Sequence, residues 1–310
     1  MKILVITRVL SFIQDSMDVW SARGDQVRQI PRYEPNIAKD YDILFFEFID
    51  NEMAKATQCP IGRTKVIIGR LHRCEYYLGA LGKFSFDWSR VQALIITGEY
   101  FYKKLQERPG GHLNKMIFQP YGVNEKRYTF RDRKKSFPSS YNVAWLAKSF
   151  DYRKAPIQGI SCFKALSDKY ESEHEEWRFY MAAGRSERGI DFYRKYLLDR
   201  RPELTEKITM YRWQDDVNSW LEPMDVFLNT SINESFCFVI AEACLKGIKP
   251  LIWDFESADH VWPKEWLFFT DNEMFNIMGK PYRSKEYRDF IIDNYSLQKQ
   301  IKAFDKIMKG

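Results

Sequence analysis

Two series of short apolar runs, separated by longer amphipathic stretches, constrain the fold of this chain more than any other feature. The first series lies at residues 2–9, 43–48, 65–69, 93–97 and 115–119. The second lies at residues 142–146, 177–182, 207–211, 226–229, 249–252 and 266–269. Each run has the length of a strand, and helical patterns such as 157–170, 189–198 and 236–246 lie between the runs. This alternation predicts an α/β protein with two doubly wound parallel sheets.

The join between the two series is a charged segment. Residues 126–140 read KRYTFRDRKKSFPSS, which contains a proline and lacks apolar periodicity, as is typical of an interdomain linker. We therefore predict an N-terminal Rossmann-like domain over 1–138 and a second one over 139–281. Residues 282–310 form a helical pattern with no strand after it, and we expect this segment to pack back on the N-terminal domain.

Composition excludes several classes of protein. The chain is 45% hydrophobic, which excludes a disordered chain, and no stretch approaches the ~20 apolar residues of a membrane-spanning helix. Its five cysteines form no C-x-x-C pair, and the N-terminus lacks the layout of a signal peptide. We therefore expect no disulfide framework and no zinc site, and a location in a reducing compartment, the cytoplasm.

The net charge of +6 is unevenly distributed. Residues 1–135 contain 23 Lys and Arg against 15 Asp and Glu, whereas residues 136–310 contain 25 against 27. A basic N-terminal half suggests an anionic partner, such as nucleic acid, a membrane surface or a phosphorylated acceptor. A solvated basic face that keeps the protein soluble would explain the same surplus.

The most informative segment is residues 229–253, NTSINESFCFVIAEACLKGIKPLIW. We expect a strand that ends at Asn229, a polar loop, and a helix from about Ser235 whose N-terminal amides and positive dipole end face a ligand phosphate. Those amides belong to Ser235, Phe236 and Cys237. Glu234 and Glu242 lie eight residues apart, so their carboxylates could hold hydroxyls at opposite ends of one extended ligand. A helix cap and a surface residue are the alternative interpretation of this acidic pair.

The same segment carries a resemblance to a known family. ESFCFVIAEACLKG, residues 234–247, resembles the Glu-x7-Glu segment of GT-B-fold retaining glycosyltransferases, E-x-F-G-x-x-x-x-E-A-x-x-x-G, with Cys237 in place of the usual glycine. The resemblance implies two Rossmann-like domains that face a central cleft. It also implies that Glu234 contacts the hydroxyls of the donor sugar and that Glu242 holds the ribose of a nucleoside diphosphate.

Three further segments are similar to the same family, and the first lies at the start of the second domain. NVAWLAKSFDYRKAP, which begins at Asn142, looks like the glycine-arginine then lysine-glycine segment that opens the second domain. Lys148 takes the arginine's place, and Lys154 or its neighbour Arg153 takes the lysine's. Two cations facing a diphosphate would stabilise the charge that builds on the leaving group, although an exposed basic loop is the alternative.

In the first domain, KVIIGRLHRCEYY places His72 just beyond a strand, where family members carry a histidine beside the sugar. The resemblance implies that His72 contacts the donor sugar or the reaction centre, and that Arg70 and Arg73 face donor phosphate or acceptor; a structural histidine is the alternative. QPYGVNEKRY is similar to the family's N-G-V-D turn, so we assign Gly122 to a turn. The Gly-Gly pair that family members often have after the first strand is missing from TRVLSFIQDS.

Other chemistries are disfavoured by the sequence. Asp40-Tyr41-Asp42 has the letters of a metal-binding Asp-x-Asp motif but precedes its strand, so we interpret it as an acidic turn and expect no essential metal. The patterns G-x-x-x-x-G-K-[ST] and G-x-S-x-G are absent, which disfavours a P-loop NTPase and a common serine hydrolase.

The resemblance implies a retaining hexosyltransferase that needs no cofactor, and the interpretation of Asp40-Tyr41-Asp42 as a turn favours a metal-independent one. The co-substrate would be a nucleotide-sugar, with UDP-sugars such as UDP-glucose favoured over GDP-sugars. We expect the base of the nucleotide to lie near Tyr211, Arg212, Trp213 and Gln214. The expected acceptor is a surface polysaccharide or a lipid-linked glycan precursor, and a modified DNA base is the alternative. A non-catalytic protein that binds sugar-nucleotides or nucleic acid with the same fold is a second alternative.

Overall fold

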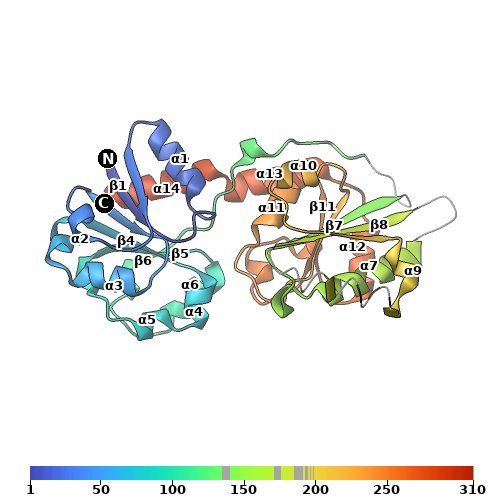
Figure 1. Ribbon diagram of the computed structural model, residues 1–310, viewed down its shortest axis with the longest axis horizontal. Helices are drawn as coiled ribbons and strands as arrows, with labels where there is room; N and C mark the ends of the chain where they lie inside the picture. The colour runs from blue at the N-terminus through green and yellow to red at the C-terminus, as the bar shows by residue number, and fades with distance from the viewer. Residues whose placement is uncertain are drawn as a thin grey trace. The chain divides into compact units, whose positions relative to one another are not determined.

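The structure is a computed structural model that describes residues 1–134, 140–170, 176–184, 191, 192, 195, 197 and 199–309. The chain forms two compact units. The first contains Met1–Asn124 together with Tyr295–Gly310, and the second contains Glu125–Asn294. Figure 1 shows the ends of the chain, marked N and C, next to each other in the first unit.

The first unit is built on a six-stranded parallel sheet in the order β2-β1-β3-β4-β5-β6. Its strands are β1 (Lys2–Ile6), β2 (Gln26–Ile30), β3 (Ile43–Phe46), β4 (Val66–Leu71), β5 (Val91–Ile96) and β6 (Met116–Phe118). Its helices are α1 (Gln14–Ala22), α2 (Pro35–Ala38), α3 (Asn51–Gln58), α4 (Arg73–Tyr77), α5 (Ala80–Lys83), α6 (Glu99–Gln106) and α14 (Leu297–Lys309). All five strands of the first series form. The pattern of apolar runs does not reveal β2, because this edge strand alternates exposed and partly buried residues and buries only Ile30 fully.

The helix α14 forms part of the core of the first unit. Its apolar residues Leu297, Ile301, Phe304 and Met308 follow helical spacing and pack with α1 against one face of the sheet. The ring centroid of Phe304 lies 5.3 Å from that of Phe45 on β3. Figure 1 shows α14, in red, beside α1. The helix α14 therefore belongs to the same compact unit as β1 and α1.

The second unit also has a six-stranded parallel sheet, in the order β12-β11-β10-β7-β8-β9. Its strands are β7 (Tyr141–Ala147), β8 (Trp177–Ala183), β9 (Ile208–Tyr211), β10 (Val226–Asn229), β11 (Lys249–Trp253) and β12 (Leu267–Phe268). Its helices are α7 (Pro156–Tyr170), α9 (Pro202–Thr205), α10 (Val217–Trp220), α11 (Phe238–Leu245), α12 (Asp271–Gly279) and α13 (Ser284–Tyr295). All six strands of the second series form, and the helix expected over 189–198 falls mostly outside the described residues.

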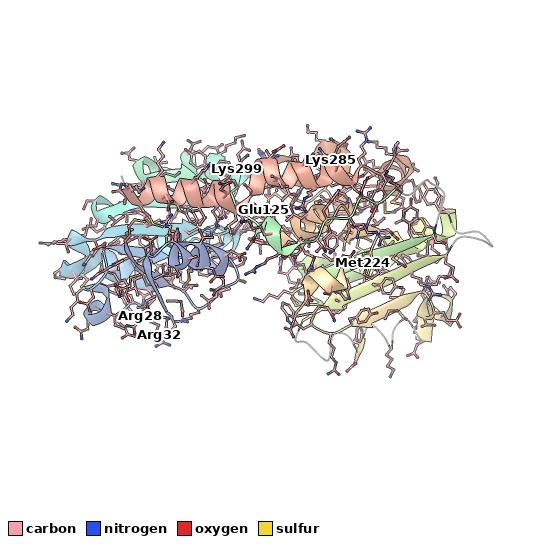
Figure 2. The ribbon with its side chains drawn as sticks, turned by 90° about the horizontal axis from the view of Figure 1, so that it is seen from above. Arg28, Arg32, Glu125, Met224, Lys285 and Lys299 are labelled. Atoms are coloured by element: carbon pink, nitrogen blue, oxygen red, sulfur yellow. The ribbon has the colours of Figure 1, made fainter. Side chains whose placement is uncertain are left out.

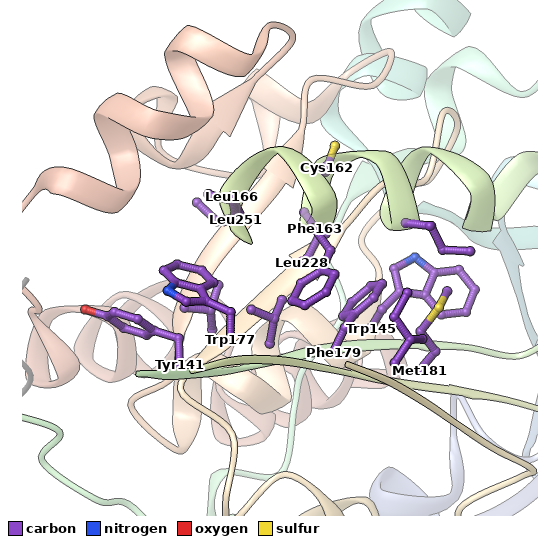
Figure 3. Close-up of a cluster of buried hydrophobic side chains, with 14 of the residues drawn as sticks. Tyr141, Trp145, Cys162, Phe163, Leu166, Trp177, Phe179, Met181, Leu228 and Leu251 are labelled. Carbon is purple, nitrogen blue, oxygen red and sulfur yellow. The ribbon is translucent and has the colours of Figure 1, made fainter. Parts of the chain in front are cut away.

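The core of the second unit lies between its sheet and α7. Phe163 on α7 stacks on Phe179 of β8 with ring centroids 5.0 Å apart, and Trp145 and Trp177 lie beside them (Figure 3). Figure 1 shows α7, α9 and α12 on this face, whereas α10, α11 and α13 cover the other. Helices therefore cover both faces, as expected for a doubly wound sheet.

The charged segment that we expected to be a linker is partly bound to the second unit. Arg133 is buried, and its guanidinium donates to the carbonyls of Met224 at 3.0 Å and Glu222 at 3.1 Å. The ammonium of Lys246, at the C-terminal end of α11, donates to Thr129 Oγ1 at 2.8 Å. The division between the compact units falls at Asn124 and Glu125, before the boundary near 138 that composition suggests, because these polar contacts bind residues 129–133 to the second unit.

The two chain segments at the edge of the first unit run side by side. The amide of Val123 donates to the carbonyl of Tyr295 at 2.8 Å, and the amide of Leu297 donates to the carbonyl of Val123 at 2.9 Å. A Cβ on Gly122 would lie 2.7 Å from the Cβ of Gln300 and 3.0 Å from the Cα of Leu297. Gly122 is therefore needed for close approach to α14 rather than for a turn.

No helix within the described part of the chain combines the length and the hydrophobicity that crossing a bilayer requires.

Candidate active site

The second unit has a reversal of strand order at the centre of its sheet. The chain runs from β7 outward to β8 and β9 and then crosses to β10 on the other side of β7. Open parallel sheets bind ligands outside the carboxyl ends of the strands at such a reversal. The two loops at this place are residues 148–155, after β7, and residues 230–237, after β10.

Three charged side chains meet between these loops. The carboxylate of Glu234 accepts a hydrogen bond from the guanidinium of Arg153 at 2.8 Å and forms a short ion pair with the ammonium of Lys154. Glu234 and Lys154 are both more than nine-tenths buried. The structure thus brings together the acid that the resemblance assigns to the donor sugar and the two alternatives, Lys154 and Arg153, for the lysine of the family's segment. A buried carboxylate with two cations can accept hydrogen bonds from hydroxyls, and its cations can bind phosphate oxygens.

Local hydrogen bonds fix the loop that carries Lys154. Asp151 Oδ1 accepts from the amide of Lys154 at 3.1 Å, and the hydroxyl of Ser149 donates to Asp151 Oδ2 at 2.6 Å. Burial raises the pKa of Asp151, but the Ser149 hydrogen bond and the charge of Arg153 outweigh it, so the pKa is lowered overall. The carboxylate therefore stays ionised and caps the short helical turn of residues 152–154.

The two loops also contact each other through their backbones. The amide of Ile232 donates to the carbonyl of Arg153 at 2.9 Å. The hydroxyl of Thr230 lies 3.0 Å from the carbonyl oxygen of Ala155 and accepts a hydrogen bond from the indole of Trp145 at 3.0 Å. The position of the Glu234–Lys154 pair is therefore set by main-chain contacts as well as by charge.

Two residues in these loops have left-handed backbones. Ala155 has φ +46° and Cys237 has φ +61°, in a region that costs a non-glycine residue roughly 1–2 kcal/mol. Both stand where the glycosyltransferase motifs have glycine, the first after the lysine and the second in E-x-F-G. The backbone conformation that those glycines favour is thus present here with other side chains.

The helix after Glu234 starts later than expected. Because Cys237 is left-handed, α11 begins at Phe238 rather than at about Ser235. Ser235 and Phe236 therefore belong to the loop, and Cys237 is the residue that precedes the helix. The expectation that these three residues supply the first helical amides is wrong. Burial raises the pKa of the Cys237 thiol to about 12, so this cysteine stays protonated.

Glu242 lies on the least buried face of α11. All residues from Val239 to Leu245 are buried except Glu242, which is half-buried like Phe238 four residues before it. Residues four apart share one face of a helix. Glu242 and the start of α11 therefore lie along one side, as binding of an extended ligand would require.

The residues expected around the nucleotide lie at the carboxyl ends of β7 and β9. Lys148 is exposed, and its carbonyl oxygen would lie 2.6 Å from a Cβ on Gly184, the residue after β8. The same Cβ would lie 2.7 Å from the indole of Trp213. Trp213 is 50% exposed and donates its indole N–H to Asp215 at 2.8 Å. Gly184 thus allows an aromatic ring and the backbone of Lys148 to come together.

The neighbours of Trp213 differ in exposure. Tyr211 is half-buried, with its ring 6.4 Å from that of Tyr180. Arg212 is exposed, and its carbonyl accepts from the side-chain amide of Gln214 at 2.9 Å. Trp213 therefore offers the largest exposed aromatic surface among the four residues expected near the base.

In the first unit, His72 is buried, and both of its ring nitrogens have protein partners. Nε2 lies 2.7 Å from the carbonyl oxygen of Glu47, and Nδ1 lies 2.5 Å from the hydroxyl of Tyr121. A carbonyl oxygen only accepts, so Nε2 carries the hydrogen and Nδ1 accepts from Tyr121 when the ring is neutral. The ring is therefore held in one orientation at the carboxyl end of β4.

Arg70 lies inside the first unit. Its side chain is 0% exposed and pairs with the carboxylate of Glu47 at 3.0 Å. Its other terminal nitrogen donates to Gln300 Oε1 on α14 at 3.2 Å. The expectation that Arg70 faces phosphate or acceptor does not fit this placement. Arg73 is half-buried, with its guanidinium 5.8 Å from the ring centre of Tyr77.

Sequence reasoning missed the partners that organise this region, namely Glu47, Tyr121, Gln300 and Glu75. Glu75 Oε2 accepts from the amide of His72 at 2.9 Å, and Oε1 has no hydrogen-bond partner in the described structure. Burial raises the pKa of Glu75 to about 8, and the charges of Asp50 and Glu47 add to this effect. The spacing of His72 and Glu75, which matches a capping box, is the one signal that could have indicated this contact.

The Asp-x-Asp letters lie at the opposite end of the first unit's sheet from His72. Asp42 accepts from the amide of Lys2 at 3.1 Å, at the amino ends of β1 and β3. Among the described residues, no three His, Cys, Asp or Glu side chains gather closely enough to hold a metal ion.

Comparison with known protein families finds no match, and comparison with curated proteins finds none either. Solved structures are similar over the whole chain. Anabaena HepE in complex with UDP has 12% sequence identity and a TM-score of 0.72, with 100% of both chains covered. Sucrose-phosphate synthase from Thermosynechococcus elongatus has 12% identity and a TM-score of 0.71, with 99% of this chain and 98% of that chain covered. The lipopolysaccharide outer core galactosyltransferase WaaB has 13% identity and a TM-score of 0.70, with 100% and 99% covered.

At these identities the similarity shows the fold. The chain has the GT-B fold, an α/β architecture of two Rossmann-like units, each with a six-stranded parallel sheet. This confirms the fold class expected from the two series of apolar runs.

Proposed function

We propose that the protein is a retaining glycosyltransferase that moves a hexose from a nucleotide-sugar to an acceptor hydroxyl. The meeting of Glu234 with Arg153 and Lys154 at the strand-order reversal of the second unit carries this proposal. The GT-B fold supports it, because a glycosyltransferase from Rickettsia africae and the galactosyltransferase WaaB are similar in structure to this chain.

The donor would bind along the carboxyl edge of the second unit. Its base would stack near Trp213, its ribose would bind Glu242, and its sugar hydroxyls would bind Glu234. Lys148, Lys154 and Arg153 would bind the diphosphate by charge-assisted hydrogen bonds. A UDP-sugar is the favoured donor, because the structures of Anabaena HepE hold UDP, UDP-glucose, or UDP with glucose.

The reaction would be a substitution at the anomeric carbon. The acceptor oxygen forms a bond to that carbon as the bond to the diphosphate oxygen breaks, and the acceptor's proton passes to the departing phosphate oxygen on the same face. Negative charge builds on the diphosphate, so cations held ready beside it lower the barrier without metal assistance. Exclusion of water would limit hydrolysis of the donor.

Pairing of Lys154 with Glu234 would change when the donor binds. A phosphate would replace Glu234 as the partner of Lys154, while Arg153 and the sugar hydroxyls would remain as partners of Glu234, so neither buried charge would be left uncompensated. Glu234 would then be available to sugar hydroxyls. The Lys154–Glu234 ion pair would thus form in the absence of donor and separate when the donor binds.

The experiment is release of UDP from a panel of UDP-sugars, measured with the wild-type chain and with Glu234→Gln. We expect slow turnover of at least one donor and a loss of about 100-fold or more in the variant, as for removal of one stabilising group at a reaction centre. The matched control is Glu286→Gln, because Glu286 is an exposed glutamate on α13 that pairs with Arg283. Binding of UDP without turnover of any donor would instead favour the non-catalytic binding protein.

A further inference from the structure

Three residues other than glycine have a left-handed backbone in the described structure, and all three lie in loops that follow strands of the second sheet. They are Ala155 after β7, Cys237 after β10 and Ser257 after β11. Such residues persist only where neighbouring contacts hold them, and they gather at sites of binding or reaction. Glycine would adopt the φ of +61° at position 237 without steric cost. The cysteine side chain therefore has to contribute a contact that glycine lacks.

The thiol of Cys237 contacts Asn229, the last residue of β10. Asn229 is 4% exposed, and its Nδ2 donates to Cys237 Sγ at 3.4 Å and to Ser231 Oγ at 3.3 Å. Burial raises the pKa of Cys237 to about 12, so the sulfur belongs to a neutral thiol, which is a weak acceptor. A single carboxamide thus binds the second residue and the last residue of the loop 230–237.

Glu234 lies between two fixed parts of this loop. Before Glu234, the hydroxyl of Thr230 and the amide of Ile232 bind the loop that follows β7. After Glu234, the contact between Cys237 and Asn229 holds the loop to the end of β10. The carboxylate of Glu234 therefore has little freedom to move away from the cations that it meets.

The carboxamide of Asn229 has only part of its hydrogen-bonding capacity satisfied. Its Oδ1 is buried and finds no hydrogen-bond partner within the described part of the chain. A buried polar atom without a partner lowers the free energy of unfolding, and a leucine of similar shape would avoid that loss. An asparagine at this position is therefore poorly explained by stability alone.

We propose that Asn229 is a positioning residue of the candidate active site, because it joins Ser231 to Cys237 and thereby fixes the loop that carries Glu234. The positioning role rests on the proposed function, whereas closure of the loop by the carboxamide does not. A cysteine in place of the motif's glycine supplies the partner that Asn229 needs at the end of the loop.

The first test separates positioning from stability. Asn229→Leu removes both polar atoms of the carboxamide and keeps the volume of the side chain. We expect a urea midpoint no lower than that of the wild type. For a UDP-sugar that the wild type turns over, kcat should fall about tenfold or more, with a smaller change in KM. An unchanged kcat would overturn the proposal, and a loss of kcat together with a lowered midpoint would overturn it by assigning Asn229 to stability.

The matched control for this test is Asn142→Leu. Asn142 is half-buried at the amino end of β7, and its side-chain amide donates to the carbonyl of Pro223 at 2.9 Å, next to the Met224 labelled in Figure 2. Because this contact lies at the opposite end of the sheet from Glu234, Asn142→Leu should lower the urea midpoint and leave kcat unchanged.

The second test replaces the partner of Asn229. Cys237→Ser keeps a group that accepts from the carboxamide, whereas Cys237→Ala does not. We expect the serine variant to keep kcat close to that of the wild type and the alanine variant to lose as much as Asn229→Leu. The double variant of Asn229→Leu and Cys237→Ala should lose no more than either single variant. Cys244→Ala, at a buried cysteine farther along α11, is the matched control. Equal kcat values for the serine and alanine variants would overturn the proposal.

Alkylation of Cys237 by iodoacetamide tests the loop without any turnover. In Asn229→Leu the end of the loop is released, so the thiol of the native protein should react about tenfold faster than in the wild type. Cys162, which is buried in the core of the second unit, is the internal reference and should react equally slowly in both proteins. Equal rates at Cys237 would overturn the proposal. Faster alkylation in a chain that turns over no donor would contradict the proposed function alone.

Discussion

Replacement of Glu75 by glutamine should stabilise the protein at alkaline pH and reduce the dependence of its stability on pH. Glu75 is buried beside His72 at the start of α4, and burial raises its pKa to about 8 from the usual 4.5. The folded state therefore holds this proton more tightly than the unfolded state. Between these two pH values the folded state binds more protons, so the free energy of unfolding falls as the pH rises.

The size of the effect follows from the two pKa values. Each pH unit between them changes the free energy of unfolding by about 1.4 kcal/mol, so ionisation of Glu75 costs the folded protein about 5 kcal/mol at most. Glutamine keeps an oxygen that accepts from the His72 amide but has no proton to lose. Above pH 8 the variant should therefore be more stable than the wild type by about 2–5 kcal/mol.

The assay is urea unfolding of both proteins from pH 5 to pH 9. The matched control is Glu273→Gln, because Glu273 occupies the same position in the capping box at the start of α12 but is exposed. Hydrogen bonds from the amides of Phe269 and Thr270 lower the pKa of Glu273. Glu273→Gln should therefore change the pH dependence of the free energy of unfolding only at acidic pH. Parallel curves for wild type and Glu75→Gln between pH 5 and pH 8 would refute the reasoning.

Two further substitutions test the contacts of α14. Gly122→Ala should destabilise the protein by about 1–3 kcal/mol, because the added Cβ would lie 3.0 Å from the Cα of Leu297. Gly82→Ala is the control: a Cβ there meets nothing within 4 Å, so this variant should be less destabilised in the same urea assay. Phe304→Ala should lower the free energy of unfolding by about 3–5 kcal/mol, because it leaves a cavity beside Phe45 and Trp20. Lys302 is exposed, so Lys302→Ala should have little effect. Equal urea midpoints for these two variants would contradict the assignment of α14 to the core.

The sequence predicts the sheets of this protein well, because buried parallel strands are apolar on both faces. Of the twelve strands in the described residues, eleven are visible as apolar runs. The missing strand, β2, lies at an edge, where exposure removes that signal. The local sequence pattern likewise cannot show that Arg133 and Thr129 of the expected linker bind Lys246 at the end of α11, because these residues are far apart in the chain.

In the candidate site too, the sequence predicts the residues whose signal lies within one short segment and misses contacts between residues far apart in the chain. Glu234, Lys154 and Arg153 are found from motifs, because each motif lies within one loop. The left-handed Cys237 moves the start of α11, and a motif with glycine at that position does not reveal what a cysteine will do. Arg70 was expected to face donor phosphate or acceptor, but its side chain binds Glu47, just after β3, and Gln300 on α14. Only the folded chain brings such residues together.

The anomeric configuration of the product, measured by ¹H NMR before mutarotation, tests directly whether the transfer is retaining. The wild-type chain is supplied with a UDP-α-sugar that it turns over and with a methyl glycoside as acceptor. We expect the α configuration to be kept in the transferred or hydrolysed sugar and Glu234→Gln to lose the reaction. A β product, or turnover unaffected by Glu234→Gln, would contradict a retaining transfer centred on the Glu234–Lys154 pair.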